Sequence, residues 1–227
     1  MSQSILVGAM LRLDEERVLT IVANMLDKGT LPMDIMDGMR EGIIRVRQMY
    51  EQGKFFLADL MMAAEIFTAV AQMLKKIKSI SGSEGPPGEP VVIGTVKNDI
   101  HDIGKNIMVQ LLQYKGFQVI DLGVDVAPLD FVRAARDHAS KVLFLSGLLT
   151  LSYEPMKLTV QELQRNNLRE GIKVVIGGLV NEQVRKFVNA DYWTRDSWVG
   201  LDLCQTILFP RGRGIDKAER GKKEWTA

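Results

Sequence analysis

The chain has 227 residues, of which 46% are apolar and 25% charged, and its formal net charge is +1. This composition is typical of a globular protein of one or two domains, and the small charge excludes a strong field for nucleic acid or an anionic membrane. The single cysteine, Cys204, excludes an internal disulfide framework and a cysteine-based metal cluster. The N-terminus lacks the pattern of a signal peptide, and no run approaches the roughly 18 consecutive apolar residues of a membrane span. We therefore expect a cytoplasmic protein.

The first third of the chain, from about residue 15 to residue 80, has a helical pattern. Apolar residues recur every three or four positions, with breaks at Lys28-Gly29 and Gln52-Gly53. The breaks predict at least three helices, and a further one is expected over residues 4–12. We therefore predict a helical-bundle domain over residues 1–80, followed by a linker at residues 81–90, where the sequence SGSEGPPGEP cannot continue a helix.

After Pro90 the pattern changes to short β-rich runs that alternate with stretches of helical length. The predicted strands cover residues 91–96, 118–122, 141–146, 173–176 and 192–194. The alternation predicts a Rossmann-like (flavodoxin-like), doubly wound parallel five-stranded sheet over residues 91–209, with a last helix over 197–208. Residues 210–227 are rich in glycine, lysine and arginine, and we expect a mobile tail.

The loop after the first predicted strand is the most informative segment, with the sequence TVKNDIHDIGKN at residues 95–106. It stands where open α/β sheets bind ligands, at the carboxyl end of a strand. Asp99 and His101 are two residues apart, so in an extended loop both side chains can point to one side. Gly104 allows a turn or the close approach of a ligand.

A lone histidine limits the chemistry of this loop. The other histidine, His138, has no partner pattern around it. A zinc site needs three or four protein ligands, and a nucleophilic triad needs a serine or cysteine elbow; neither is visible. One histidine backed by an acid suits a metal whose other ligands come from a macrocycle. The alternative is a polar loop in which Asp99 and His101 only satisfy main-chain groups.

Three ordered motifs carry a family resemblance. The sequence DIHDIGKN at residues 99–106 resembles the Asp-x-His-x-x-Gly signature of cobalamin-binding domains, in the extended form found in methionine synthase and in the corrinoid proteins of methanol, methylamine and O-demethylase systems. Residues 145–152, LSGLLTLS, are similar to the Ser-x-Leu-x-Thr stretch after the third strand, and residues 176–178 to the Gly-Gly turn after the fourth. The resemblance spans about residues 5–209, because the helical part is similar to the cap of the methyl carriers.

The resemblance implies a role for each matching residue. His101 ligates cobalt, Asp99 accepts a hydrogen bond from the other ring nitrogen, and Ser152 ends this relay, although Ser152 also fits a helix N-cap. Further implied contacts of the cofactor are Asp102, Ile103, Gly104, Ser146, Leu148, Thr150, Gly177 and Gly178. The alternatives are ordinary strand-end hydroxyls for Ser146 and Thr150, and a tight turn for the two glycines.

In the predicted cap, GKFFLADL at residues 53–60 resembles the family's Gly-x-x-Phe-Leu-Pro entry to its last helices. Phe56 then stands at the position whose ring covers the upper face of the corrin, unless it is simply bundle core. Ala58 occupies the usual place of proline, which puts the start of that helix in doubt.

The function implied by the resemblance is that of a corrinoid methyl carrier, part of a multi-component methyltransferase and not a self-sufficient enzyme. Cobalt(I) would take a methyl group through a donor-specific methyltransferase, and methyl-cobalt(III) would pass it to tetrahydrofolate or a thiol through an acceptor methyltransferase, with a reductive activase as a third partner. Two alternatives are the small subunit of an adenosylcobalamin mutase, which would normally lack the cap, and a cobalamin-dependent sensor. Residues 1–30, with their acidic run Asp14-Glu15-Glu16, offer no basic surface for the DNA contact that a sensor needs. The sequence does not name the methyl donor.

Overall fold

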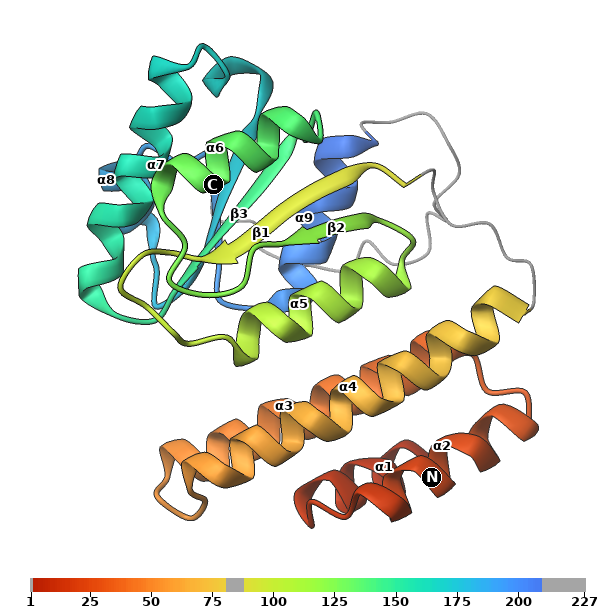
Figure 1. Cartoon of the computed structure of the whole chain (residues 1–227). Coiled ribbons are helices and arrows are strands. Elements are labelled where there is room, and N and C mark those ends of the chain that lie inside the picture. Colours follow the sequence, from red (N-terminus) through yellow and green to blue (C-terminus); the bar gives the residue numbers. More distant parts are fainter. Residues whose placement is uncertain (1, 81–87, 210–227) are drawn as a thin grey trace. The chain divides into compact units, whose positions relative to one another are not determined.

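The computed structural model describes residues 2–80 and 88–209, which fall into two compact units, residues 1–83 and 84–227 (Figure 1). Most of the predicted linker and the whole predicted tail, residues 81–87 and 210–227, lie outside the described residues.

Residues 2–80 form four helices, as the periodicity predicted. They are α1 (Ser2–Leu11), α2 (Glu15–Asp27), α3 (Pro32–Glu51) and α4 (Leu57–Ile80). Asp14 caps α2 by accepting the main-chain N–H of Arg17 at 3.0 Å, and Pro32 occupies the first turn of α3, where its missing N–H costs no hydrogen bond. Helix α1 packs closely on α3 because Gly42 has no side chain: a Cβ there would lie 2.8 Å from the side chain of Met10.

Helix α4 is long and apolar enough, by length and composition alone, to cross a membrane, with a mean hydropathy of 1.5 over Leu57–Lys76. The core helix of a water-soluble bundle passes the same test. One face of α4 is buried against its neighbours α2 and α3. The buried residues are Ala63, Ile66, Phe67, Val70, Ala71 and Leu74. Because these residues recur at three- and four-residue spacing, the pattern is that of a bundle helix.

Residues 88–209 form a five-stranded parallel sheet, which confirms the predicted doubly wound fold. The strands are β1 (Pro90–Thr95), β2 (Gln118–Asp121), β3 (Val142–Gly147), β4 (Lys173–Gly178) and β5 (Tyr192–Thr194), in the order β2-β1-β3-β4-β5. β1 begins at Pro90, within the predicted linker. The strand order reverses direction between β1 and β3, and ligands of such folds bind at the carboxyl ends of the strands at this point.

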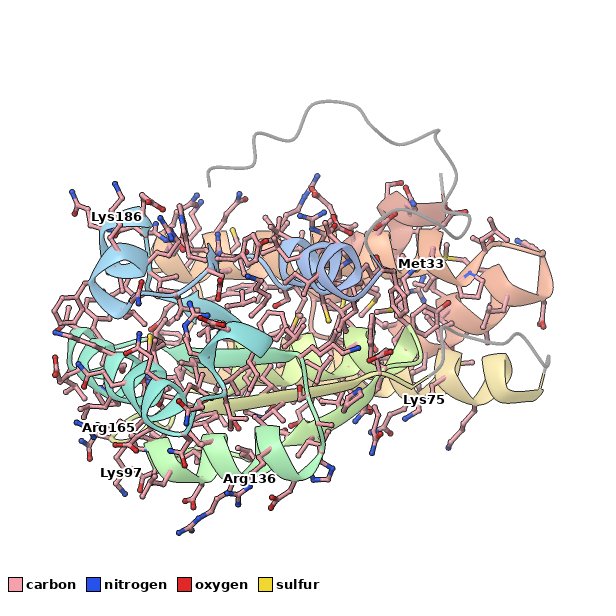
Figure 2. All side chains as sticks on the ribbon, turned by 90° about the horizontal axis from the view of Figure 1, so that it is seen from above. Met33, Lys75, Lys97, Arg136, Arg165 and Lys186 are labelled. Atoms are coloured by element: carbon pink, nitrogen blue, oxygen red, sulfur yellow. The ribbon has the colours of Figure 1, made fainter. Side chains whose placement is uncertain are left out.

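Helices cover both faces of the sheet (Figure 1). α5 (Ile103–Tyr114) and α9 (Ser197–Leu208) pack together on one face, while α6 (Pro128–Asp137), α7 (Tyr153–Arg165) and α8 (Glu182–Val188) cover the other. Charged side chains such as Lys97, Arg136, Arg165 and Lys186 point outward from the unit (Figure 2). The core between the sheet and α6, α7 and α8 is built from every second residue of the central strands and from apolar residues of these helices. Its fully buried members include Val92, Phe131, Leu143, Leu145, Met156, Val174 and Ile176.

The strand register brings the three sequence motifs to one edge of the sheet. Thr95 pairs with Ser146, Ser146 with Gly177, and Gly177 with Thr194, so one residue from each of β1, β3, β4 and β5 stands in a single row. This row lies at the carboxyl ends of the strands. The loops that follow β1, β3 and β4 therefore start side by side.

Candidate functional site

The Asp99 carboxylate and the His101 ring form the centre of the site. His101 Nδ1 lies 2.7 Å from Asp99 Oδ1, and the same oxygen accepts the main-chain N–H of His101 at 2.9 Å. The Asp99 side chain is fully buried, whereas 45% of the His101 side chain is exposed. Among the described residues no hydrogen bond is recorded for His101 Nε2, the other ring nitrogen.

The second oxygen of Asp99 is held from the loop after β3. Oδ2 accepts hydrogen bonds from Ser152 Oγ at 2.6 Å, from the Leu148 N–H at 2.7 Å and from the Leu149 N–H at 3.3 Å. Burial acts to raise the pKa of Asp99, but the hydrogen bonds from the Ser152 hydroxyl, the His101 main chain and ring and the Leu148 N–H outweigh it and lower the pKa from 3.8 to about 2. Asp99 is therefore ionised near neutral pH, and Nδ1 of His101 must be the donor.

Ser152 occupies the position that the sequence left open between a relay and a helix cap. It does stand at the N-cap of α7, but its side chain makes no capping hydrogen bond. The buried hydroxyl donates to Asp99 instead, across 53 residues of sequence. Ser152, Asp99 and His101 are thus joined in one hydrogen-bonded series, which we call the relay.

The loop that carries His101 is held by contacts that the sequence did not predict. Thr95, buried at the end of β1, donates its hydroxyl to the main-chain oxygen of His101 at 3.1 Å. Asn98 has a left-handed backbone, with φ of 65°, and its N–H donates to Asp125 Oδ1 at 2.8 Å. Lys97 also reaches Asp125, at 3.0 Å, and points outward from the loop (Figure 2). A hydroxyl at the end of an apolar strand was the one available signal for Thr95.

A buried ion pair fixes the first turn of α5. Lys105 Nζ contacts both oxygens of Asp121 at the end of β2, at 2.9 and 2.7 Å, and donates to Asn106 Oδ1 at 2.7 Å. Asn106 in turn donates to Asp102 Oδ2 at 3.1 Å. One carboxylate oxygen of Asp102, a predicted cofactor contact, is therefore hydrogen-bonded to another residue of the protein. Lys105 lies within the first sequence motif, but the sequence predicts no role for it, because its partner Asp121 lies 16 residues away.

The glycines of the motifs differ in what they do. Gly178 has φ of 103°, and a Cβ there would lie 2.1 Å from the Gly147 oxygen, so only glycine fits. Gly104 lies in the first turn of α5 without a positive φ, so of the two uses that the sequence allowed, a turn or the close approach of a ligand, the backbone here does not need the first. A Cβ on Gly104 would meet nothing within 4 Å. The space beside Gly104 is therefore open among the described residues.

Apolar side chains stand exposed around His101. Leu148 in the loop after β3 is 46% exposed, and Ile100, beside His101, is 73% exposed. Leu151 and Leu179 extend this set from the loops after β3 and β4. Of the other predicted contacts, Ile103, Ser146 and Gly177 are half-buried and Thr150 is exposed. Exposed leucine and isoleucine side chains clustered at strand ends indicate a surface that a largely apolar ligand covers.

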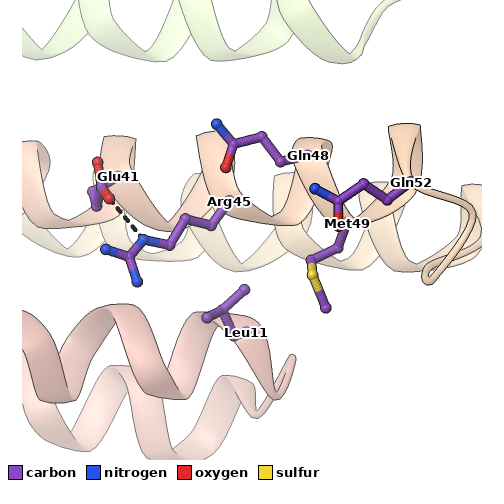
Figure 3. Close-up of a pocket in the computed structure, with 6 residues that line it drawn as sticks. All are labelled: Leu11, Glu41, Arg45, Gln48, Met49 and Gln52. Carbon is purple, nitrogen blue, oxygen red and sulfur yellow. Dashed lines mark hydrogen bonds and ion pairs between the residues drawn. The ribbon is translucent and has the colours of Figure 1, made fainter.

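In the helical unit, Phe56 is 76% exposed, so it does not belong to the core of that unit. The doubt raised by Ala58 is resolved, because α4 begins at Leu57 and Asp59 Oδ2 accepts the main-chain N–H of Phe56 at 2.7 Å. A carboxylate that reaches back in this way caps the helix without proline. The unit also has a hollow of about 430 Å³ (Figure 3). It is lined by Leu11, Glu41, Arg45, Gln48, Met49 and Gln52, none of which the motifs include.

These residues fit a metal that brings its own equatorial ligands. No group of three or more His, Cys, Asp or Glu side chains within residues 2–80 and 88–209 could hold an ion by itself. One oriented imidazole, an exposed apolar surround and the open space beside Gly104 match a cobalt macrocycle held by a single histidine. The fold and site define a cobalamin-binding module.

Comparison with known proteins supports the same class. Residues 89–195 match a family model described as a B12 binding domain, and residues 5–75 match a second model with that description. The dimethylamine corrinoid protein of Methanosarcina barkeri is 35% identical over 89% of this chain and 95% of its own length. A corrinoid protein of Desulfitobacterium hafniense (strain Y51) is 32% identical over 86% of this chain and 92% of that protein.

Among solved structures, the monomethylamine corrinoid protein of Methanosarcina barkeri is 25% identical and superimposes with a TM-score of 0.69, covering 90% of this chain and 98% of that one. The chain belongs to the corrinoid proteins of methyltransferase systems, and its cofactor is a corrinoid. Membership of this family decides against the mutase and the sensor, which the sequence had left open.

Proposed function

We propose that this protein carries a methyl group on its corrinoid between two methyltransferases. The cofactor supplies a cobalt centre that can accept a methyl group and release it. The proposal rests most on one observation: Asp99 holds the His101 ring by Nδ1, which leaves Nε2 as the single protein nitrogen for cobalt. His101 would hold the cobalt through Nε2, and the bound corrinoid would supply the methyl-accepting chemistry to the substrate of a partner enzyme.

The relay sets the donor strength of His101 in this proposal. The ionised Asp99 accepts a hydrogen bond from Nδ1–H of His101, so it fixes the tautomer and makes Nε2 a better ligand. Ser152 and the Leu148 N–H stabilise the charge on Asp99, which limits how far the proton can shift toward it. The hydrogen bonds of the relay would thus keep the His101 imidazole oriented when the corrinoid is bound.

The remaining predicted roles are part of the same proposal. Ser146, Thr150 and the Gly177-Gly178 turn stand in or beside the row at the strand ends, which supports a contact with the nucleotide tail of the corrinoid. The exposure of Phe56 supports a contact between this residue and the cofactor. We also propose that residues 1–80 and residues 91–209 are separate domains, with residues 81–90 as the linker. We place the protein in the cytoplasm.

The partners are proposed by chemistry. A donor-specific methyltransferase would load the carrier, an acceptor methyltransferase would unload it to tetrahydrofolate or a thiol, and a reductive activase would restore the reduced cofactor. The names of the relatives favour methylamines as donors, because two of those described above are methylamine corrinoid proteins. Selectivity for the donor would reside in the partner enzyme.

A transfer assay tests the proposal. Reduced, corrinoid-loaded protein is incubated with purified methylamine, methanol and aromatic methyl ether methyltransferases, each with its isotopically labelled methyl donor. We expect label in the protein-bound corrinoid with at least one pair, and its release to tetrahydrofolate or a thiol when an acceptor enzyme is added. His138→Ala serves as a control that leaves the site intact. Loaded protein that takes label from no donor would contradict the carrier function.

A further inference from the structure

Tyr153 follows Ser152 directly and opens α7, yet its hydroxyl contacts another loop. It donates to the main-chain oxygen of Leu179 at 2.7 Å. Leu179 comes directly after the Gly177-Gly178 turn at the end of β4. A single dipeptide, Ser152-Tyr153, therefore bonds to Asp99 through its first residue and to the turn after β4 through its second.

The turn and the relay are also in direct contact through Gly147. The Leu179 N–H donates to the Gly147 oxygen at 3.0 Å, and Gly178 approaches that carbonyl so closely that a Cβ would lie 2.1 Å from it. On its other side Gly147 faces Ser152, because a Cβ on Gly147 would lie 2.6 Å from Ser152 Cβ and 3.1 Å from its Oγ. The backbones of Gly178 and Gly147 are in direct contact here, and Gly147 also packs against the side chains of Ser152 and Met156, so a shift of the Leu179 main chain would reach Ser152 through Gly147.

Both main-chain groups of Leu179, the N–H and the carbonyl oxygen, therefore make hydrogen bonds to the segment that carries Ser152. The Leu179 N–H is bonded to the Gly147 oxygen and the Leu179 oxygen to the Tyr153 hydroxyl, whereas the residue as a whole is 44% exposed. Removing the Tyr153 hydroxyl would release one of the two ties and leave the Gly147 contact unchanged. The tyrosine is thus placed to hold the turn in the position that suits Ser152.

We propose that Tyr153 is a positioning residue that couples the Gly177-Gly178 turn to the relay, so that a group bound beside the turn helps to orient His101. This rests on the proposed function, in which the nucleotide tail of the corrinoid lies beside the turn. A corrinoid without that tail makes no contact with the turn, so Tyr153 should not increase its binding affinity. The tail and the cobalt ligand are then recognised cooperatively.

Full-length protein and Tyr153→Phe are compared for two ligands: hydroxocobalamin, which has the tail, and aquocobinamide, which lacks it. Binding is followed by the absorption spectrum of the corrinoid. Losing one hydrogen bond of ordinary strength predicts that the variant binds hydroxocobalamin about threefold to tenfold more weakly. Binding of aquocobinamide should be unchanged, and the fraction of bound cobalamin with the histidine-ligated spectrum should fall. Tyr192→Phe, at the half-buried first residue of β5, is the matched control and should behave like the wild type.

The outcomes separate this inference from the function on which it rests. Equal weakening for both corrinoids would overturn it, because a tyrosine needed only for folding does not distinguish them. Unchanged binding of both by Tyr153→Phe would also overturn it, while leaving the proposed function standing. Wild-type protein that takes up neither corrinoid would overturn the proposed function and this inference together.

Discussion

Ser152 and Asp99 lie 53 residues apart in sequence, yet Ser152 Oγ donates to Asp99 Oδ2 at 2.6 Å in the interior of the α/β unit. The bond exists because β1 and β3 are neighbours in the sheet, so the loops that follow them meet at its carboxyl edge. It completes the set of partners around a carboxylate that is itself bonded to His101.

Ser152→Ala should destabilise the protein, because it removes a hydrogen bond to a buried charge while Asp99 remains. Hydrogen bonds to charged groups contribute about 1.5–3 kcal/mol, and the Leu148 and Leu149 N–H groups still contact Oδ2, so we expect a loss of about 1–2 kcal/mol. Chemical denaturation of the cofactor-free protein measures it. Thr150→Ala removes an exposed hydroxyl two residues away and should change stability by less than about 0.5 kcal/mol. Equal effects of the two substitutions would contradict this account of Ser152.

The lowered pKa of Asp99 makes a pH-dependent contribution to stability. Its pKa is about 2 in the folded protein and 3.8 in the unfolded chain, so the unfolded state binds the proton more tightly. The stabilisation is therefore present above the unfolded pKa and is lost as the pH falls through 3.8 toward about 2. It amounts to roughly 2 kcal/mol.

Asp99→Asn isolates this contribution, since other carboxyl groups are common to both proteins. The difference in unfolding free energy between wild type and variant should narrow by roughly 2 kcal/mol between about pH 5 and about pH 2. Urea denaturation of the cofactor-free proteins at several pH values gives this difference. A gap that stays constant over that range would mean that Asp99 does not titrate as described.

Because the two side chains of the Lys105–Asp121 ion pair are buried to different degrees, we expect substitutions of the two residues to lower the free energy of unfolding by different amounts. The Lys105 side chain is 2% exposed and that of Asp121 is 32% exposed. Asp121→Ala leaves a buried ammonium group without its counter-ion, which typically costs about 3–5 kcal/mol. Lys105→Met keeps the apolar stem and leaves a carboxylate that water can reach, so it should cost clearly less. Thermal or chemical unfolding of both variants checks the order, and the reverse order would contradict the assigned burial.

A substitution at Gly104 should change cofactor affinity without lowering the stability of the fold. A Cβ at Gly104 would meet no atom within 4 Å beyond its chain neighbours and the backbone of its own helix, and leucine favours a helix more than glycine does, so Gly104→Leu should fold at least as stably as the wild type. If the cofactor lies over this position, its affinity should fall at least tenfold, to be measured by titration with hydroxocobalamin. Gly171→Leu, another glycine with open space around it, is the control. Full cofactor affinity in Gly104→Leu would show that the corrinoid does not approach this turn.

Sequence patterns predicted the elements because their causes are local. The alternation of apolar strands and helical stretches gave all five strands, and the three- and four-residue spacing gave the helices of residues 2–80. Asp99 and His101 were also accessible, since both lie in one short loop. For Ser152, the choice between helix cap and relay needed the position of its hydroxyl, which the sequence pattern does not contain.

The contacts that were missed depend on pairs distant in sequence. Thr95 holds the His101 carbonyl only because the loop folds back on the strand end, and Lys105 finds Asp121 on the adjacent β2. Tyr153 reads in sequence as an ordinary first-turn residue, and its bond to Leu179 requires the packing of β3 beside β4. No local pattern carries such information.

The absorption spectrum of bound cobalamin tests the central claim, that His101 is the protein ligand of the cobalt. Wild-type protein reconstituted with hydroxocobalamin should show the spectrum of a histidine-ligated corrinoid, and His138→Ala should show the same. His101→Ala should lose that signature and recover it, at least in part, when free imidazole is added. A His101→Ala protein whose bound spectrum equals that of the wild type without imidazole would contradict the claim.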